Sequence, residues 1–477
     1  MTQPSADRPI PLHPPVPMLT FLGATGTVTG SRFLLDTPRA RVLVDGGLFQ
    51  GLKALRSRNW EPFPVPAGSI DAVVATHAHI DHIGYLPALV RDGMAGSIHV
   101  TPGTEALARI VLPDSGHLHE EEAAYANRKG FSKHHPALPL YTEEDARASL
   151  LQLVAHDFDA EVEVAPGVHV TFRPAGHILD SASISVRLAD AADRRVVFSG
   201  DLGRPAHPIL RSPAPVGRAD IVVMESTYGD RTHDDAGALE ELAATIRRTA
   251  DRRGTVLIPA FAVDRTEVVL HHLRALTREG AIPDLPIYVD SPMALDALRT
   301  YREAIRHGSA ELNPALDRGT DPFDGGQVTE VRAVEDSMAL ADVAGPAIIV
   351  SASGMASGGR VVHHLARLAS DRRNTILLVG FQAPGTRGRT LAEGATQLKM
   401  FGRYIPVRAE VVDLGAFSVH ADEGELRAWL ATADEPPEVV YLVHGEQEAS
   451  EALRDTITAR TEQLVVVPHH LERVRLD

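Results

Sequence analysis

Short apolar runs that end in polar or glycine-rich stretches recur along the chain, and their spacing changes near its middle. Runs such as 71–75 and 195–199 have the length of strands and stop at polar residues. From residue 221 onward, apolar strand patterns alternate with helical patterns, as in 255–259 and 266–277. Strands that alternate with helices predict a mostly parallel sheet. We therefore expect an α/β protein whose later half contains a second α/β domain.

The stretch directly after the run 71–75 concentrates the candidate chemistry. It holds three histidines and one aspartate, namely His77, His79, Asp81 and His82. In an extended segment His77 and His79 point the same way, and the other two lie on the next turn, aimed at the same pocket. Neutral imidazoles and a carboxylate suit a borderline divalent ion such as zinc. The alternative is a polar strand-to-helix loop with chance histidines.

Three more polar residues follow apolar strand patterns and stand beside glycine. His177 and Asp201 are each an ordinary loop residue when taken alone. Asp45 ends another strand pattern, where a carboxylate can orient a ligand histidine, although a plain strand-end turn explains it as well.

The motifs together resemble a known family. His-x-His-x-Asp-His after a strand resembles the signature of the metallo-β-lactamase fold, a superfamily of mostly two-metal hydrolases, and His177 and Asp201 match its third and fourth motifs. Glu225 in Glu-Ser-Thr-Tyr-Gly, His420 in Phe-Ser-x-His-Ala-Asp and His444 in Val-His-Gly-Glu resemble the three further motifs of the β-CASP family. These are nucleases of the same fold with a cap domain inserted ahead of the last two histidines. The resemblance runs from about residue 19 to 470, with Asp264 standing where a glycine is expected.

The resemblance implies the fold class and the domain order. We expect an α/β protein built as a metallo-β-lactamase αββα sandwich with an inserted α/β β-CASP cap domain. The expected divisions are a disordered N-terminal tail at 1–17, the first part of the metallo-β-lactamase domain at 18–228, the β-CASP domain at 229–408, and the completion of the first domain at 409–477.

The resemblance also implies two divalent ions in a shared site. One ion is expected on His77, His79, His177 and Asp201, and the other on Asp81, His82, Asp201 and His444. Zn²⁺ is the first expectation, and Mn²⁺ or Fe stay open because this ligand set tolerates each.

The same resemblance supplies catalytic roles. A metal-bridged hydroxide is expected to attack phosphorus, and Asp81 is expected to be essential to that step. His420 is not assigned to a metal and suits a general acid, held in place by Glu225. The alternative is that His420 and Glu225 are packing groups at the hinge of the cap.

Charge is distributed unevenly along the 477 residues. The formal net charge of −16 argues mildly against a nucleic-acid partner, yet the window 351–410 holds nine Lys or Arg and three acidic residues, which leaves +6. Its two glycine-containing loops are expected to lie side by side at the carboxyl ends of parallel strands and to contact the substrate backbone. The expected substrate contacts are Ser353, Gly354, Arg360, Arg387 and Arg389. The alternative is that the glycines allow tight turns and the arginines form surface ion pairs.

The composition indicates the cellular compartment in which the protein is expected. The chain has no cysteine, which excludes disulfides, iron–sulfur clusters and thiol catalysis and fits a reducing compartment. It shows no signal-peptide pattern at Met1–Pro17 and no apolar run that approaches a membrane span of about 18 residues, so we expect a cytoplasmic protein without a membrane partner.

Three function classes remain. A ribonuclease that hydrolyses single-stranded RNA in processing or decay uses every feature named above. A small-molecule hydrolase of the lactamase or thioesterase type leaves the inserted domain idle, and a metal-bound scaffold would be expected to lack ligands. A DNA-processing β-CASP nuclease is a further alternative, but such enzymes resemble this chain less, because they tend to carry an apolar residue where His444 stands. A homodimer is left open.

Overall fold

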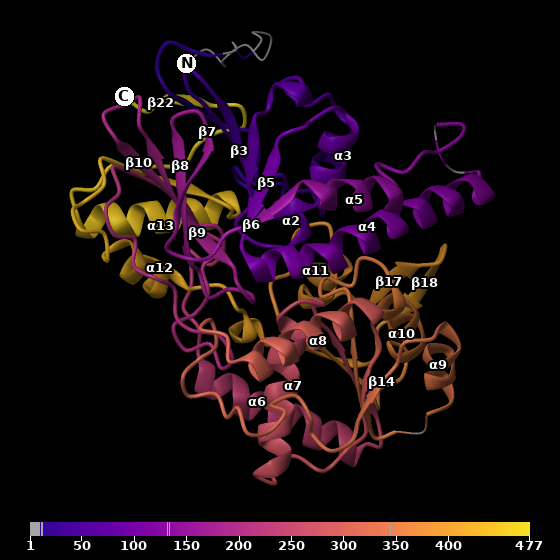
Figure 1. Ribbon diagram of the computed structural model, residues 1–477. Coiled ribbons are helices and arrows are strands. Elements are labelled where there is room, and N and C mark those ends of the chain that lie inside the picture. Colours follow the sequence, from indigo (N-terminus) through magenta and orange to yellow (C-terminus); the bar gives the residue numbers. More distant parts are fainter. Residues whose placement is uncertain (1–9, 11–12, 131, 133, 344) are drawn as a thin grey trace. The chain divides into compact units, whose positions relative to one another are not determined.

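The computed structural model describes residues 10, 13–130, 132, 134–343 and 345–477, and it divides into two compact units (Figure 1). Unit 1 comprises Met1–Pro205, Ser212–Thr232 and His420–Asp477, and unit 2 comprises Ala206–Arg211 and His233–Val419. Most of the tail predicted at 1–17 lies outside the described residues. Unit 2 is thus an insertion in the sequence of unit 1, and the expected fold class is confirmed.

Two seven-stranded sheets form the centre of unit 1. In spatial order, the first sheet contains β22 (Arg473–Arg475), β1 (Met18–Phe21), β2 (Phe33–Asp36), β3 (Arg41–Val44), β4 (Ala72–Val74), β5 (Ser97–Val100) and β6 (Leu153–Ala155). The second contains β21 (Val465–Val466), β20 (Val439–Val443), β11 (Ile221–Glu225), β10 (Arg194–Phe198), β9 (Ala182–Leu188), β8 (Val168–Pro174) and β7 (Glu161–Ala165).

The main core of unit 1 lies between these sheets. The rings of Phe33 and Phe198, one from each sheet, are 5.8 Å apart, and Phe21 packs 5.1 Å from Tyr441. Fully burying side chains of this size contributes about 1.5–3 kcal/mol each. A rigid sandwich follows, and it holds fixed the strand ends from which the polar loops emerge.

Helices flank the two sheets and complete the αββα layers (Figure 1). Unit 1 contains α1 (Lys53–Ser57), α2 (Ile80–Ile83), α3 (Leu86–Arg91), α4 (Pro102–Lys129), α5 (Glu143–Ser149), α12 (Glu423–Leu430) and α13 (Gln447–Arg460). Leu426 and Trp429 of α12 and Leu453 of α13 form a second buried cluster against the outer face of the second sheet.

Unit 2 is built on a six-stranded sheet. Its order is β14 (Val328–Glu330), β13 (Ile287–Val289), β15 (Ala347–Ser351), β12 (Thr255–Pro259), β16 (Thr375–Leu378) and β19 (Glu410–Asp413), and every pairing is parallel. The expected parallel sheet is confirmed. Because β19 pairs with β16, the compact unit continues past residue 408 to Val419.

The remaining elements of unit 2 are helices and one hairpin. They are α6 (Asp235–Asp251), α7 (Arg265–Arg278), α8 (Pro292–His307), α9 (Val334–Ala339), α10 (Arg360–Leu368), α11 (Arg387–Ala392), β17 (Gln397–Met400) and β18 (Arg403–Pro406). Short 3₁₀ turns occur in both units at Arg58–Trp60, Ala67–Ser69, Leu150–Gln152, Leu340–Asp342 and Gly415–Phe417.

The contacts of Asp264 explain how an aspartate can stand at a position where a glycine is expected. It precedes α7 with a φ of 65°, a conformation that glycine adopts without strain. Its buried carboxylate accepts a hydrogen bond from the Tyr301 hydroxyl at 2.7 Å and lies 3.0 Å from Nε2 of His207. These contacts stabilise an aspartate in a backbone conformation that residues other than glycine rarely adopt.

Within the described residues, no helix has both the length and the apolar character that crossing a bilayer requires.

Candidate metal centre

The histidine-rich loop joins β4 to α2 and is fixed by the segment that follows β3 and by the segment that precedes β2. Gly46 N–H donates to the carbonyl of His82 at 2.7 Å, and Ser31 N–H donates to the carbonyl of Asp81 at 2.8 Å. A Cβ on Gly47 would lie 1.6 Å from the Asp81 carbonyl oxygen, so only glycine fits there. Asp81 and His82 are therefore held against the backbone of a neighbouring strand end.

His177 and Asp201 lie on two loops that touch. His177 follows β8, and its N–H donates to Ser181 Oγ at 2.9 Å. Asp201 follows β10, and a Cβ on Gly203 in the same loop would lie 1.8 Å from the Gly176 carbonyl. This close approach brings together two side chains from the strands on either side of β9, at the same edge of the second sheet.

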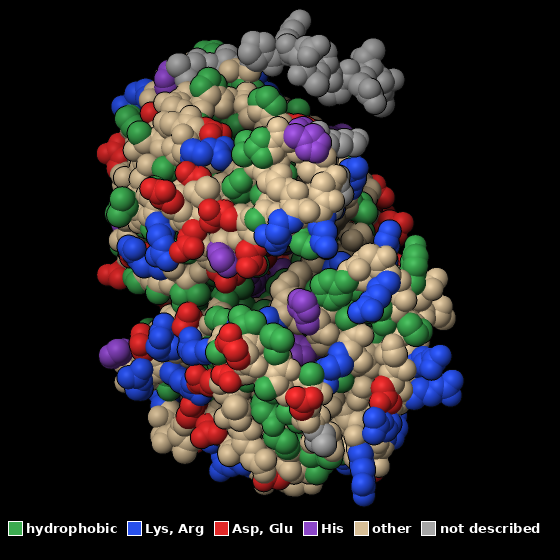
Figure 2. Space-filling view, turned by 90° about the vertical axis from the view of Figure 1, so that its right-hand side faces the viewer, with side chains coloured by type: hydrophobic (Ala, Val, Ile, Leu, Met, Phe, Trp, Pro, Cys, Tyr) green, Lys and Arg blue, Asp and Glu red, His purple; other side chains and the backbone are tan. Residues whose placement is uncertain are grey.

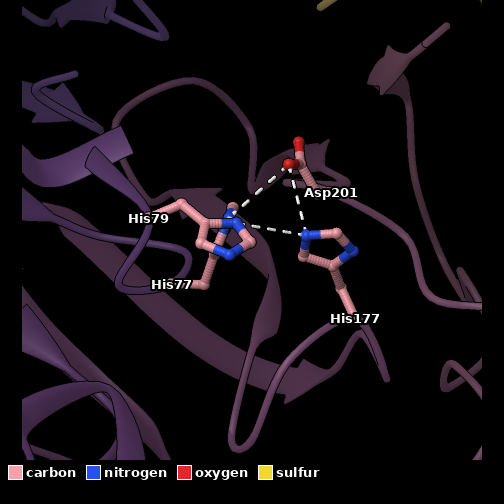
Figure 3. Close-up of side chains that lie close together, drawn as sticks. All are labelled: His77, His79, His177 and Asp201. Carbon is pink, nitrogen blue, oxygen red and sulfur yellow. Dashed lines mark hydrogen bonds and ion pairs between the residues drawn. The ribbon is translucent and has the colours of Figure 1, made fainter. Parts of the chain in front are cut away.

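Three imidazoles and one carboxylate converge at the first predicted metal position (Figure 3). Nδ1 of His79 lies 3.1 Å from Nε2 of His77 and 3.3 Å from Nε2 of His177. Oδ2 of Asp201 lies 3.5 Å from the His77 nitrogen and 3.6 Å from the His177 nitrogen. A tetrahedral zinc ion with bonds of roughly 2.0–2.1 Å places its ligand atoms about 3.3 Å apart. The observed spacing fits such an ion.

A second group has the same spacing. Nε2 of His82 lies 3.2 Å from Nε2 of His444 and 3.2 Å from Oδ1 of Asp201, and His444 Nε2 lies 3.4 Å from Oδ2 of Asp81. Asp201 therefore turns one carboxylate oxygen to each group. The structure brings all seven predicted ligands close together in two groups that meet at Asp201, and the donor set fits metal binding.

Electrostatics prepares the first group for a cation. Burial lowers the pKa of His77 well below its usual range and lowers the pKa of His79 to about 4, so both rings are neutral near pH 7. Burial alone would raise the pKa of Asp201, but the imidazoles of His444, His82 and His77 hold it well below its usual value. Neutral imidazole and ionised carboxylate are the forms that bind metals.

The second group attracts positive charge. Burial acts to lower the pKa of His82, but the carboxylates of Asp201 and Asp45 outweigh it and raise that pKa well above its usual value. The pKa of His444 is also raised, because Asp201 and Asp81 outweigh the effect of burial. A divalent cation supplies the positive charge that these carboxylates otherwise draw from protons.

Asp45 lies where the sequence predicted an orienting carboxylate. Its Oδ2 is 2.7 Å from Nδ1 of His82, and its Oδ1 accepts from the Thr76 N–H at 2.8 Å. The Thr76 hydroxyl also lies 3.0 Å from Nδ1 of His77. Sequence reasoning did not single out Thr76, although its place directly before the histidine motif could have marked it.

His420 and Glu225 form a third group beside Asp201. Nδ1 of His420 lies 3.3 Å from both carboxylate oxygens of Glu225 and 4.0 Å from Oδ2 of Asp201. Glu225 is fully buried at the end of β11, and its Oε1 accepts from the Leu202 N–H. Asp422 caps α12 through a capping box with Glu425, which fixes the backbone that follows His420.

The glycine-containing loops of unit 2 touch each other as expected. Gly388 N–H donates to the Met355 carbonyl at 3.0 Å, and Gln382 Nε2 donates to the Gly354 carbonyl at 3.1 Å. Their strands β15 and β16 are separated by β12, so the loops meet across one intervening strand. Ser353 Oγ lies 3.4 Å from the Ser357 N–H.

The three predicted substrate arginines all have partners within unit 2. Arg360 bonds the buried Asp290 carboxylate at 2.7 Å and the carbonyls of two neighbouring residues. Arg387, in the first turn of α11, donates to the carbonyl of Ser357 at 2.8 Å, and Arg389 pairs with Glu393 at 2.7 Å. Burial lowers the pKa of Arg387. Their role toward substrate stays a prediction.

Three family models match the chain. The β-lactamase superfamily domain matches residues 40–258, the β-CASP domain matches residues 266–391, and the Zn-dependent metallo-hydrolase RNA specificity domain matches residues 404–468. The matched segments together cover both units.

Curated relatives match the chain along most of its length. The protein named Ribonuclease TTHA0252 of Thermus thermophilus is 36% identical over 443 residues, 93% of this chain and 96% of the relative. The protein named transcription termination factor FttA is 31% identical over 479 residues in Pyrococcus abyssi and 30% identical over 471 residues in Methanosarcina mazei; each match covers 96% of this chain and 71% of the relative. A crystal structure of a protein of unknown function from Enterococcus faecalis shares the fold, with a TM-score of 0.51, 14% identity, and coverage of 96% of this chain and 100% of the other.

Proposed function

This chain belongs to the β-CASP family of metallo-β-lactamase-fold ribonucleases, and we propose that it hydrolyses single-stranded RNA at the centre formed by its seven converging histidines and aspartates. It is a metal-dependent RNA nuclease. The observation that carries the proposal is the joint geometry of that centre. Two groups of ligand atoms share Asp201, and a separate histidine, His420, is held beside them by Glu225.

The metal complement is part of the proposal. We assign one ion to His77, His79, His177 and Asp201, and a second ion to Asp81, His82, Asp201 and His444. The atom spacing of about 3.1–3.6 Å in both groups supports this assignment. Zn²⁺ is the proposed ion, with Mn²⁺ or Fe as alternatives. When bound, such ions polarise a phosphodiester and acidify water.

The protein side chains supply the remaining needs of the reaction. Asp201 and Asp81 place negative charge where the cations bind, and Asp45 holds His82 in the orientation that presents Nε2 to the centre. His420 receives its orientation from Glu225, which faces Nδ1. Nε2 of His420 is then the ring atom that delivers a proton to the departing ribose oxygen.

The substrate and its setting extend the same proposal. RNA as the substrate is supported by the RNA specificity domain match and by the ribonuclease relative. We propose RNA processing or decay in the cytoplasm, with Ser353, Gly354, Arg360, Arg387 and Arg389 as substrate contacts of the cap and a homodimer as the assembly. The alternatives of a small-molecule hydrolase and a DNA-processing nuclease are not favoured by the comparisons.

The direct test uses metal-loaded protein with end-labelled single-stranded RNA and with DNA of the same sequence, each with and without chelator. We expect cleavage of RNA that the chelator abolishes. Cleavage of DNA at an equal rate, or RNA cleavage that survives removal of the metal, would contradict the proposal.

His420→Ala separates the general acid from the metal site. We expect both ions and RNA binding to persist while the cleavage rate falls by about 10²–10⁴-fold, the range typical of general-acid help. Elemental analysis of the variant is the control. Loss of an ion would make His420 a ligand, which its group with Asp201 and Glu225 also permits.

A further inference from the structure

The hairpin of unit 2 carries exposed side chains that neither its fold nor the metal centre requires. Strands β17 and β18 pair only with each other among the described residues, in the register Leu398 with Ile405 and Lys399 with Tyr404. Leu398 and Ile405 are buried in the core of unit 2, whereas Tyr404 is 65% exposed. Side chains directly opposite each other in a hairpin share a face, so Lys399 and Tyr404 lie together on the outer face.

The turn of the hairpin contains an unexpected residue. Phe401 and Gly402 have φ values of 50° and 78°, and two such central residues mark a type I′ turn. Asparagine, aspartate and glycine favour the first of these positions, and a bulky side chain there is strained. Core burial does not compensate, because Phe401 is 51% exposed. A strained residue with an exposed aromatic side chain points to a use for that side chain.

Aromatic surface and positive charge occur together here. The ring of Phe401 lies 4.7 Å from the exposed ring of His363 on α10, which extends the aromatic surface beyond the turn. The segment 397–408 contains Lys399, Arg403 and Arg408 and no acidic residue, in a protein of net charge −16.

The cations of the segment 397–408 differ from two of the predicted substrate arginines. Within the described part of the chain, Lys399, Arg403 and Arg408 form no ion pair with a carboxylate, and all three are exposed. Arg360 and Arg389, in contrast, are paired with Asp290 and Glu393. An exposed cation without a carboxylate partner keeps its charge available to phosphate. In Figure 2, blue and green side chains lie side by side, with few red ones, on the right-hand part of the lower half.

We propose that the β17–β18 hairpin is an accessory binding surface for single-stranded RNA, on which bases stack against Phe401 and Tyr404 while Lys399 and Arg403 contact phosphates. Exposed aromatic rings interleaved with cations bind single strands without reading sequence, since every base has a π-face. The proposal rests on RNA as the substrate of the metal centre. It adds a contact that acts on substrate binding and leaves the chemical step unchanged.

The test compares two substrates of one metal-loaded protein. Labelled single-stranded RNA offers a run of bases and phosphates for the hairpin to bind, whereas bis(p-nitrophenyl) phosphate offers little beyond the phosphodiester that is cleaved. Phe401→Asn combined with Tyr404→Thr should raise KM for RNA at least fivefold per lost stack, with kcat unchanged and with unchanged hydrolysis of the small phosphodiester. Asparagine suits the turn and threonine suits a strand, so the thermal midpoint should not fall.

Matched variants make the test specific. Tyr125→Ser removes a 44% exposed aromatic that stands beside Lys129 on α4, and it should leave KM for RNA unchanged. Lys399→Gln combined with Arg403→Gln should flatten the salt dependence of log K for RNA by about 0.7 per lost contact. Arg387→Ala combined with Arg389→Ala measures, on the same scale, one arginine that bonds backbone carbonyls and one that pairs with Glu393, and it should have the smaller effect.

Photo-cross-linking tests the surface in the unaltered protein. RNA that contains 4-thiouridine should cross-link to the peptide 397–408. Wild-type protein that cleaves RNA, shows no such cross-link and has the same KM as the hairpin variants would overturn the hairpin proposal alone. Wild-type protein that does not cleave RNA would overturn the proposed function, and the cross-link would still decide the hairpin.

Discussion

The metal centre of unit 1 and the buried Asp290 cluster of unit 2 both contain histidine and aspartate, but these side chains face different kinds of partner in the two places. In unit 2, the Asp290 carboxylate accepts from Arg360 at 2.7 Å and from the Ser337 hydroxyl at 2.6 Å, and it lies 2.6 Å from Nε2 of His364. Each polar atom of that cluster meets an atom of complementary kind, so the cluster is satisfied by hydrogen bonds alone.

In unit 1 the facing atoms are alike. Ring nitrogen faces ring nitrogen between His77 and His79 at 3.1 Å and between His82 and His444 at 3.2 Å, with Asp201 between the two pairs. Like atoms at this distance, arranged around a common point, are the arrangement that a cation organises. Buried histidine and aspartate are therefore not diagnostic by themselves; the convergence of several ring nitrogens on one shared carboxylate distinguishes this centre from the Asp290 cluster.

Asp201→Asn should have the largest effect, because Asp201 faces both of the proposed ion positions. We expect loss of metal and a fall in RNA cleavage on the order of 10³-fold or more, since bound ions contribute several kcal/mol to the transition state. Elemental analysis and single-turnover cleavage measure it. A variant that keeps its metal and most of its activity would show that Asp201, like Asp290, is a structural carboxylate and does not bind metal.

Asp290→Ala should unfold or loosen the cap and leave the metal alone. Removing one partner of a buried pair leaves His364 and Arg360 uncompensated and costs about 3–5 kcal/mol. Denaturant unfolding monitored by hydrogen exchange in unit 2 gives the stability, and metal content serves as the control. Loss of metal without loss of cap stability would contradict the structural role given to Asp290.

Asp45→Asn should weaken metal binding less than loss of a ligand does. The carboxylate of Asp45 fixes Nδ1 of His82 at 2.7 Å, and loss of such a partner typically costs about 10–100-fold in metal affinity. Competition with a chelator gives the affinity. An unchanged value would return Asp45 to the simpler interpretation of a strand-end turn.

Glu267→Gln should change how stability depends on pH. Burial, with the nearby Asp264 carboxylate, raises the pKa of Glu267 well above the ordinary value of 4.5. The folded state therefore holds a proton that the unfolded state releases, and stability falls as pH rises from about 4.5 toward the folded pKa, by at most about 1.4 kcal/mol per pH unit. Glu267→Gln should abolish this loss, so its advantage in thermal midpoint over wild type should grow between pH 5 and pH 8. Parallel pH profiles for the two proteins would contradict the assignment.

The strand patterns predicted the fold well because short apolar runs report burial directly. The parallel order of the sheet in unit 2 agrees with the alternation of strand and helix patterns along the chain. The end of the inserted unit was less accessible to sequence. β19 pairs with β16, and a strand pattern does not state its pairing partner, so the unit extends beyond residue 408.

The sequence by itself determined which residue types stand at the strand ends, and hence the metal chemistry and the family. The histidines and aspartates at positions 77–82, 177, 201 and 444 each follow an apolar strand pattern, and the resemblance of these motifs to the β-CASP family is what identified them as one ligand set. The tertiary structure alone decided the pairings. It turned one oxygen of Asp201 to each group, placed Asp45 against His82, and gave Arg360 the buried Asp290 carboxylate as its partner. These outcomes depend on distances between residues far apart in the chain, which local pattern and charge do not encode.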